Sequence, residues 1–163
     1  MHIALINPLI PQNTGSVARL SAGTNTVLHL VGDLGFSLDD RYLKRAGLDY
    51  WPAVKLQRHL DVPAFLEAVS GQRLWLFSTH ATRCYADVAY RFDDVIVFGS
   101  ETTGLPEALR QQFAQQLLRI PINGNIRSLN LANAAAVVLF EALRQCGFPE
   151  EAVVETTHEA IRR

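Results

Sequence analysis

The sequence predicts an α/β fold in which a mostly parallel sheet is flanked by helices on both faces. Short apolar runs typical of buried strands alternate with segments of helical periodicity, which is the pattern of parallel βαβ units. Three polar, glycine-bearing segments follow strand-like runs, where open α/β sheets place their ligands. The 163 residues match the usual size of one domain, and we expect a single domain over residues 1–149 and a tail over 150–163.

Apolar composition and run length indicate six strands and five helices. In chain order, strands are expected at residues 3–6, 27–31, 54–57, 74–78, 95–98 and 117–120, of which 54–57 is the weaker candidate. Helices are expected at residues 15–23, 39–45, 62–69, 106–112 and 130–146. Asn13 or Thr14 can cap the first helix, and Pro106 suits the first turn of the fourth.

The segment 130–146 has the clearest helical pattern in the chain. Its apolar residues recur at i, i+3 and i+4 and form one continuous face. Gly147 suits the C-terminal end of this helix, and Pro149 prevents its continuation. Small side chains over residues 132–136 would allow close approach by the sheet or by a second subunit, and the pattern leaves both open.

Composition and charge narrow the class of protein. No apolar run approaches the length of a membrane span and no signal-peptide pattern opens the chain, so we expect a cytoplasmic protein. Cys84 and Cys146 are isolated, which favours reduced thiols, and the scattered histidines predict no metal. The net charge of −1 does not indicate nucleic-acid binding, and residues 1–149 carry only +1. An RNA ligand would therefore require a local basic surface or one built by two subunits.

The first polar segment covers residues 7–19, with the sequence NPLIPQNTGSVAR. Gly15 would leave the N-terminus of the following helix open to a polar ligand. Arg19 would lie about one turn into that helix and point toward the same end. The alternative for this segment alone is an ordinary helix cap followed by a surface arginine.

The second segment covers residues 97–106, VFGSETTGLP, and the third covers 119–134, RIPINGNIRSLNLANA. The second lacks the Gly-Lys-Ser/Thr of a P-loop, and no GxGxxG occurs in the chain, which disfavours a nucleotide-dependent oxidoreductase. In isolation Glu101 would be an exposed loop acid. In the third segment Ser128 or Asn130 can cap the following helix. Asn133 interrupts an apolar pattern, so we expect its amide to be buried and hydrogen-bonded to neighbouring loops.

Taken in order, the three segments resemble the motifs of the SpoU branch of the trefoil-knot (SPOUT) methyltransferases. NTGxxxR occurs at residues 13–19, FGxExxGL at 98–105 and IP…SLNLxNA at 120–134, and the likeness extends over residues 1–149. The chain is most similar to the minimal bacterial subfamily that methylates the wobble nucleotide of tRNA, through NPLIPQNTG, GFSLDD and KRAGLDYW. Two departures are Ser100, where the usual motif has proline, and Phe140, where tyrosine is more usual.

The resemblance implies a C-terminal trefoil knot, a homodimer and S-adenosylmethionine as cofactor. The loops that would hold the cofactor, largely by backbone groups, contain Phe77, Gly99, Ile120 and Ser128. Arg19 corresponds to the proposed catalytic residue of the family. A guanidinium holds its proton and makes a poor base, so we expect Arg19 to stabilise negative charge on the ribose oxygen or its phosphate. The residues expected to position the reactants around it are Asn13, Glu101, Ser128 and Asn133.

The expected RNA partner is the anticodon stem-loop of tRNA, with methylation of the ribose 2′-hydroxyl of nucleotide 34. The residues expected to contact RNA are Arg41, Lys44, Arg45 and Arg58, with Tyr50 and Trp51 for base stacking. The alternative for residues 39–45 is a solvated helix with i, i+4 ion pairs. Two rival functions stay open, namely the same chemistry on another tRNA or rRNA nucleotide and a non-catalytic RNA-binding protein.

Overall fold

The computed structural model describes residues 1–37 and 48–148, so the expected helix 39–45 and the tail 150–163 lie outside it. Six strands are formed, namely β1 (His2–Ile6), β2 (Val27–Val31), β3 (Lys55–His59), β4 (Leu74–Phe77), β5 (Val95–Phe98) and β6 (Leu117–Leu118). The α-helices are α1 (Pro11–Gly23), α3 (Val62–Ala68), α4 (Glu107–Gln112) and α5 (Leu131–Cys146). Three short 3₁₀ helices are η1 (Leu48–Ala53), η2 (Tyr85–Asp87) and η3 (Ala114–Gln116).

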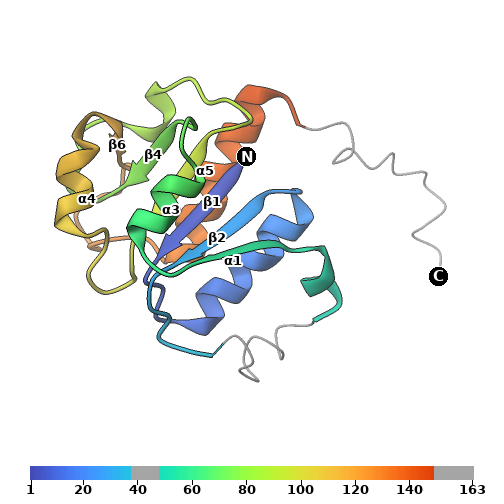
Figure 1. Cartoon of the computed structure of the whole chain (residues 1–163). Coiled ribbons are helices and arrows are strands. Elements are labelled where there is room, and N and C mark those ends of the chain that lie inside the picture. The colour runs from blue at the N-terminus through green and yellow to red at the C-terminus, as the bar shows by residue number, and fades with distance from the viewer. Residues whose placement is uncertain (38–47, 149–163) are drawn as a thin grey trace.

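The strands form one sheet in the order β3-β2-β1-β5-β4-β6, and every strand pair in it is parallel. The chain builds outward from β1 to β3 and then returns to add β5, β4 and β6 on the other side of β1 (Figure 1). The order therefore reverses between β1 and β5, and ligands of open α/β sheets bind beside such a point, at the carboxyl ends of the strands.

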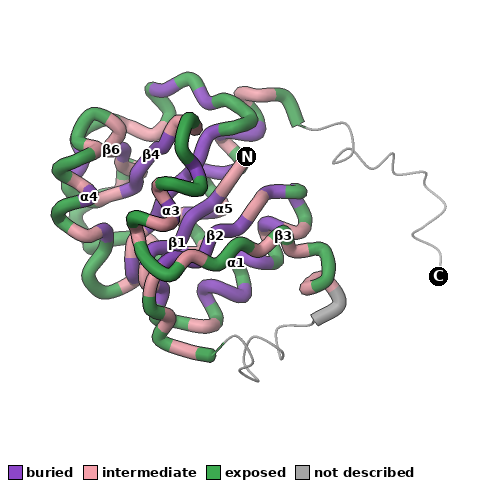
Figure 2. The backbone as a smooth tube through the Cα atoms, in the orientation of Figure 1, coloured by how far each residue is buried: buried purple, intermediate pink, exposed green. Residues whose placement is uncertain are grey.

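Alternate residues of each strand point to opposite faces of the sheet, and each face has its own core. In β1, Ile3 and Leu5 pack with residues of α1 and α5, whereas Ala4 and Ile6 pack with residues of α3 and α4. Figure 2 shows the strands buried between these helices. The expectation of a mostly parallel sheet flanked on both faces is confirmed, while the trefoil knot stays a prediction from the resemblance.

The first helix begins four residues earlier than the sequence pattern suggested. Its N-cap is Ile10, which makes no side-chain cap, and Pro11 occupies the first turn. The expectation that Asn13 or Thr14 caps the helix was wrong because the fixed φ of proline already suits the first helical position. Both residues are instead buried within α1, and Gly15 is not at its N-terminus.

The last helix has the expected ends. The Oδ1 atom of Asn130 accepts hydrogen bonds from the backbone N–H groups of Ala132 at 2.9 Å and Asn133 at 3.3 Å. Gly147 ends the helix with a φ of 75°, in the left-handed region that favours glycine. Within the described residues, no helix is long and apolar enough to cross a membrane.

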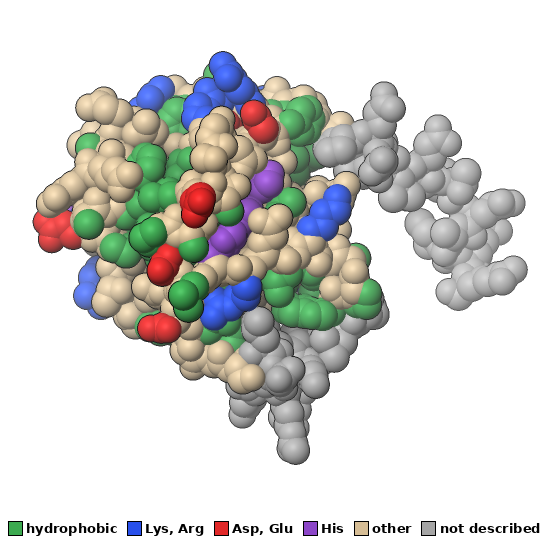
Figure 3. Space-filling view, viewed as in Figure 1, with side chains coloured by type: hydrophobic (Ala, Val, Ile, Leu, Met, Phe, Trp, Pro, Cys, Tyr) green, Lys and Arg blue, Asp and Glu red, His purple; other side chains and the backbone are tan. Residues whose placement is uncertain are grey.

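Three histidines form a hydrogen-bonded row across β1, β2 and β3. Figure 3 shows histidine side chains gathered on this face of the molecule. The amide Nε2 of Gln72 lies 3.0 Å from His2 Nε2, His2 Nδ1 lies 2.9 Å from His29 Nε2, and His29 Nδ1 lies 2.9 Å from His59 Nε2. An amide nitrogen only donates, so with neutral rings every bond in the row runs from Gln72 toward His59. His29 is almost fully buried and its ring meets that of Phe65 edge-on.

Candidate active site

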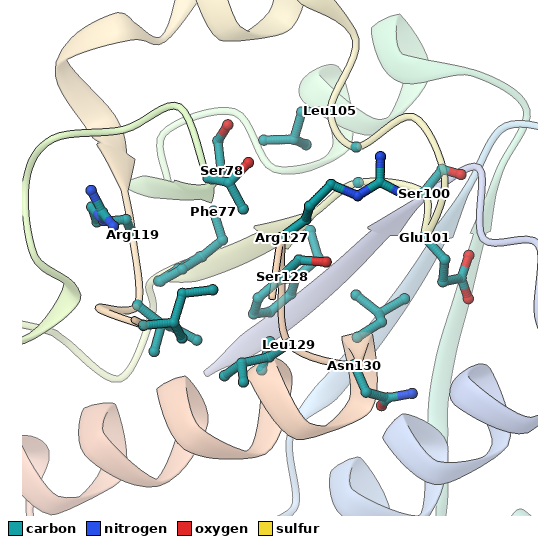
Figure 4. Close-up of a pocket in the computed structure, with 18 of the residues that line it drawn as sticks. Phe77, Ser78, Ser100, Glu101, Leu105, Arg119, Arg127, Ser128, Leu129 and Asn130 are labelled. Carbon is teal, nitrogen blue, oxygen red and sulfur yellow. The ribbon is translucent and has the colours of Figure 1, made fainter. Parts of the chain in front are cut away.

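The three polar segments meet around one cavity of about 1070 Å³. It lies beyond the carboxyl ends of β4 and β5 and is bordered by the chain between β6 and α5 (Figure 4). All four residues expected to hold the cofactor, Phe77, Gly99, Ile120 and Ser128, line it. The resemblance therefore selected residues that are far apart in sequence and adjacent in the fold.

Two aromatic rings form an apolar wall of this cavity. Phe77 ends β4 and Phe98 ends β5, and their rings stack with centroids 5.0 Å apart. Both side chains are more than nine-tenths buried, so the wall is held by the core of the sheet. Figure 4 shows Ser128 and Arg127 near these rings, with Arg127 extending toward the loop that contains Ser100.

The loop after β5 folds back on itself so tightly that Gly99 has no room for a side chain. The N–H of Ser100 donates to the carbonyl of Gly104 at 3.1 Å, and the N–H of Gly104 donates to the carbonyl of Ser100 at 2.9 Å. A Cβ on Gly99 would overlap the backbone of Gly104 and Leu105. Serine at position 100 supplies an N–H that the usual proline lacks, so this departure adds a hydrogen bond to the loop.

Glu101 joins the second segment to the first. Its carboxylate accepts hydrogen bonds from the N–H groups of Leu9 at 2.8 Å and Ile10 at 3.2 Å, and from Asn13 Nδ2 at 3.0 Å. Leu9 and Ile10 immediately precede α1, where a negative charge interacts favourably with the helix dipole. Glu101 is therefore more than an exposed loop acid, because it holds the start of α1 against the cavity.

Asn130 joins the third segment to the first. Its Nδ2 donates to Asn13 Oδ1 at 2.9 Å while its Oδ1 caps α5. Asn13 thus connects Glu101 to Asn130, and residues of all three segments form one hydrogen-bonded chain. From its local sequence Asn130 was expected only as a possible cap. The second contact depends on where α1 lies and has no local signal.

Arg19 and Asn133 do not border the cavity. Arg19 is exposed on α1, with its guanidinium carbon 5.5 Å from the centre of the Tyr50 ring. Because α1 begins at Pro11, Arg19 lies more than two turns into it, not one turn as expected. The expectation that Asn133 is buried was also wrong, since α5 turns Leu131 and Ala135 toward the core and Asn133 outward.

A shallow groove runs between α1 and α5 on the outer side of these helices. Its lining includes Gln12, Ser16, Ala132, Asn133 and Ala136. Small side chains therefore border the groove, as the alanine-rich start of α5 suggested.

The residues expected to contact RNA divide into three groups. Arg41, Lys44 and Arg45 lie outside the described residues. Arg58 donates through Nη1 to the carbonyls of Gly32 at 2.9 Å and Leu30 at 3.4 Å, which fastens β3 to the end of β2. The two aromatic residues, Tyr50 and Trp51, are partly buried and pack against the core beneath α1.

Sequence reasoning missed three arginines that line the cavity, Arg110, Arg119 and Arg127. Among the described residues none of them forms an ion pair, and the buried Nε atom of Arg110 has no hydrogen-bond partner. Among the described residues that line the cavity, the one acid is Glu101, whose carboxylate is held by Asn13 and two backbone amides. The cavity therefore has a cationic border that the net charge of the chain conceals.

The family model for the SpoU rRNA Methylase family matches residues 1–140. A tRNA (cytidine(34)-2′-O)-methyltransferase from Methylovorus glucosotrophus is 48% identical over 147 residues, covering 90% of this chain and 96% of the relative. A solved structure concerned with 2-OH methylation of C/U34 on tRNA has a TM-score of 0.84 and 46% identity, covering 88% of this chain and 94% of that one. An AdoMet-bound rRNA methyltransferase from Sinorhizobium meliloti has a TM-score of 0.78 and 28% identity, covering 88% of this chain and 55% of that one.

The fold and the site define an α/β protein with a ligand cavity built by three separate motifs at the carboxyl ends of its strands. The chain belongs to the SpoU rRNA Methylase family.

Proposed function

We propose that this protein is an S-adenosylmethionine-dependent tRNA methyltransferase that methylates the ribose 2′-hydroxyl of nucleotide 34. The observation that carries the proposal is the cavity in which all three family motifs meet. The tRNA (cytidine(34)-2′-O)-methyltransferase of Methylovorus glucosotrophus, which the chain matches over nearly its whole length, supports the choice of substrate. A protein that modifies tRNA is expected in the cytoplasm.

The cavity fits the cofactor in size and chemistry. Its volume of about 1070 Å³ is at the upper end of the range for small-molecule sites, and its border combines apolar walls with open polar groups. Phe77 and Ile120 would contact apolar parts of the cofactor, while the backbone at Gly99 and the Ser128 hydroxyl would supply hydrogen bonds. When bound, S-adenosylmethionine supplies a methyl group activated by a sulfonium.

The residues of this chain then have to align the ribose and accommodate charge. The guanidinium of Arg19 would stabilise negative charge developing on the ribose oxygen or its phosphate. Glu101, Asn13 and Asn130 would act by keeping the loops in register around the cavity, since their hydrogen bonds are with one another and with backbone groups. Ser128 faces the cavity and would contact the reactants directly.

A homodimer would complete this site. Arg19 does not line the cavity of its own chain, so it would act at the cavity of a second copy. The groove between α1 and α5 supports this arrangement because its small side chains permit close helix contact. Val137 and Phe140 on the outer face of α5 are exposed apolar residues that such an interface would cover. Asn133, exposed in the same groove, would then be buried between subunits.

The RNA would enter across the cationic border of the cavity. Arg110, Arg119 and Arg127 lie there, and in a dimer two such borders could flank one anticodon stem-loop. Arg41, Lys44 and Arg45 stay proposed RNA contacts. Arg58, whose guanidinium already donates to two carbonyls, would contribute mainly charge.

The direct test is to incubate the protein with labelled S-adenosylmethionine and tRNA that lacks 2′-O-methylation, and then to map the labelled nucleotide. We expect label on the ribose of nucleotide 34. Transfer to another position would contradict the assignment to nucleotide 34 but would still support 2′-O-methylation of RNA. Cofactor binding without transfer to any RNA would favour a non-catalytic RNA-binding protein. The Arg19→Ala protein should bind cofactor normally and lose turnover, and equal loss of both would show that Arg19 has another role.

A further inference from the structure

Tyr50 makes two contacts with α1, one with its backbone and one with the side chain of Arg19. The Tyr50 hydroxyl donates to the carbonyl of Gly15 at 3.1 Å. The guanidinium carbon of Arg19 lies 5.5 Å from the centre of the Tyr50 ring, within the range of a cation–π contact. Gly15 precedes Arg19 by four residues, which is about one helical turn. Tyr50 therefore meets both the side chain of Arg19 and the turn of α1 that leads to it.

The ring of Tyr50 is well placed to hold a charged side chain still. It is partly buried and packs against the core shared by β1, β2, α1 and α5. The hydroxyl contact with Gly15 fixes the ring against α1 as well. Arg19 itself is exposed and forms no ion pair within the described residues, so without the ring its many rotamers would be open.

We propose that Tyr50 is a positioning residue for Arg19, and that it does not serve as a stacking surface for an RNA base. The ring contacts the guanidinium and the core, and a base would have to displace Arg19 to stack on it. By restricting Arg19 to a narrow set of orientations, Tyr50 lowers the entropy lost when the guanidinium meets the ribose or its phosphate. This inference rests on the proposed catalytic role of Arg19.

A double-mutant cycle on the full chain tests the inference. The proteins are wild type, Arg19→Ala, Tyr50→Leu and the double variant, with single-turnover methyl transfer measured at saturating tRNA and S-adenosylmethionine. Tyr50→Leu should slow transfer by about tenfold to a hundredfold, the size expected for a misplaced catalytic group. In the Arg19→Ala background the same change should alter the slow residual rate, followed over long incubations, by less than about twofold, because a residue that acts through Arg19 has nothing left to position.

Binding measurements separate positioning from base stacking. Tyr50→Leu should leave the Kd for tRNA and for cofactor within about threefold of wild type, since the lost effect is in the chemical step. Tyr50→Phe, which keeps the ring, should retain most of the rate. Tyr90→Phe is its matched control, because it removes a tyrosine hydroxyl that donates to the carbonyl of Tyr85. A large rise in the tRNA Kd with an unchanged rate would overturn the proposal in favour of stacking.

The remaining outcomes distinguish this inference from the proposed function. An active Arg19→Ala protein would remove Arg19 from the mechanism and overturn the positioning role of Tyr50, while the proposed methyltransferase function would stand. A normal rate for Tyr50→Leu beside an inactive Arg19→Ala protein would overturn the positioning role alone. Should Tyr50→Leu fail to fold, the wild-type protein provides the test by NMR. The side-chain protons of Arg19 should be shifted upfield by the ring current of Tyr50, and unshifted signals would overturn the contact.

Discussion

Asp94 and Glu101 flank the same strand, β5, and hold the two ends of the sheet in different ways. Asp94 precedes β5 and is fully buried, and it accepts hydrogen bonds from Arg73 Nε at 2.9 Å, Arg73 Nη2 at 2.7 Å, Trp75 Nε1 at 2.9 Å and Arg91 N at 2.9 Å. Glu101 follows β5 at the edge of the cavity, is only partly buried, and accepts from one amide side chain and two backbone N–H groups.

The two carboxylates therefore have different roles: Asp94 stabilises the fold, and Glu101 helps to build the cavity. Asp94 has a cationic partner, and its hydrogen bonds close one end of the sheet, so little there is left for a ligand. Around Glu101, the buried Nε atom of the cavity-lining Arg110 has no hydrogen-bond partner among the described residues, and the exposed Ser128 faces the cavity. A polar residue whose hydrogen bonds are complete within the chain stabilises the fold, whereas one with open donors at a cavity is available to a ligand.

The largest expected effect on stability is that of a substitution at Asp94. Asp94→Asn removes the charge that faces Arg73 and replaces one acceptor with a donor, so unfolding free energy should fall by about 3–5 kcal/mol. Urea unfolding measures the loss. Cofactor affinity of the folded protein, measured by calorimetry, should stay near wild type. Loss of affinity without loss of stability would contradict the separation of scaffold from site.

The histidine row predicts a smaller, pH-dependent effect on stability. Burial, with further contributions from His2 and His59, lowers the pKa of His29 to about 4. As pH falls below about 6.5 the unfolded chain takes up a proton at this residue, while the folded protein stays neutral until about pH 4, so stability falls over this interval by up to about 3 kcal/mol. Well above pH 6.5, His29 is neutral in both the folded and the unfolded protein, and it causes no loss of stability.

Urea unfolding at pH 7.5 and pH 4.5 measures this dependence. His29→Gln is the control, because glutamine can donate and accept but does not titrate. Its loss of stability between the two pH values should be smaller than that of wild type. Equal losses would show that carboxylates elsewhere account for the acid sensitivity.

At the cavity end of β5, a substitution should reduce stability less than Asp94→Asn does and should weaken cofactor binding more. A side chain at position 99 must displace the backbone of Gly104 and Leu105, so Gly99→Ala should cost about 1–3 kcal/mol and weaken cofactor binding at least about tenfold. Gly23→Ala is the matched control. In the described part of the chain, no atom beyond the neighbouring residues and backbone of α1 lies within 4 Å of the added Cβ there, and the change should leave binding intact. Normal cofactor affinity in Gly99→Ala would contradict the assigned cavity.

The smallest expected effect on stability is that of Glu101→Gln. The variant keeps an acceptor oxygen but loses the charge that faces two N–H groups at the start of α1, which should cost about 1–2 kcal/mol. The rate of methyl transfer should fall clearly although the loss of stability is small, because Asn13 loses its charged hydrogen-bond partner and Asn130 is held through Asn13. Thermal unfolding and single-turnover rates measure the two effects. A protein as unstable as Asp94→Asn would show that both carboxylates serve the scaffold.

The sequence predicted the elements of the fold better than their junctions. Strands at 27–31 and 95–98 and the helix ending at Cys146 were correct to the residue because apolar periodicity is a local property of the chain. The start of α1 was misplaced because two local rules competed, and proline at the first turn prevailed over the side-chain caps that follow it. The alternation that marks strands does not state their order, so the placement of β5 beside β1 had to come from the structure.

By itself, the sequence determined the fold class, the three motifs and some of the residues that line the cavity, such as Phe77, Gly99 and Ser128, because a motif is a local pattern of the chain. Only the tertiary structure showed that Glu101, Asn13 and Asn130 are hydrogen-bonded to one another, that Arg19 rests on Tyr50, and that Asn133 is exposed. These facts depend on how α1 and α5 pack beside the sheet. A hydrogen bond between residues about a hundred positions apart is set by that packing, and no local pattern records it.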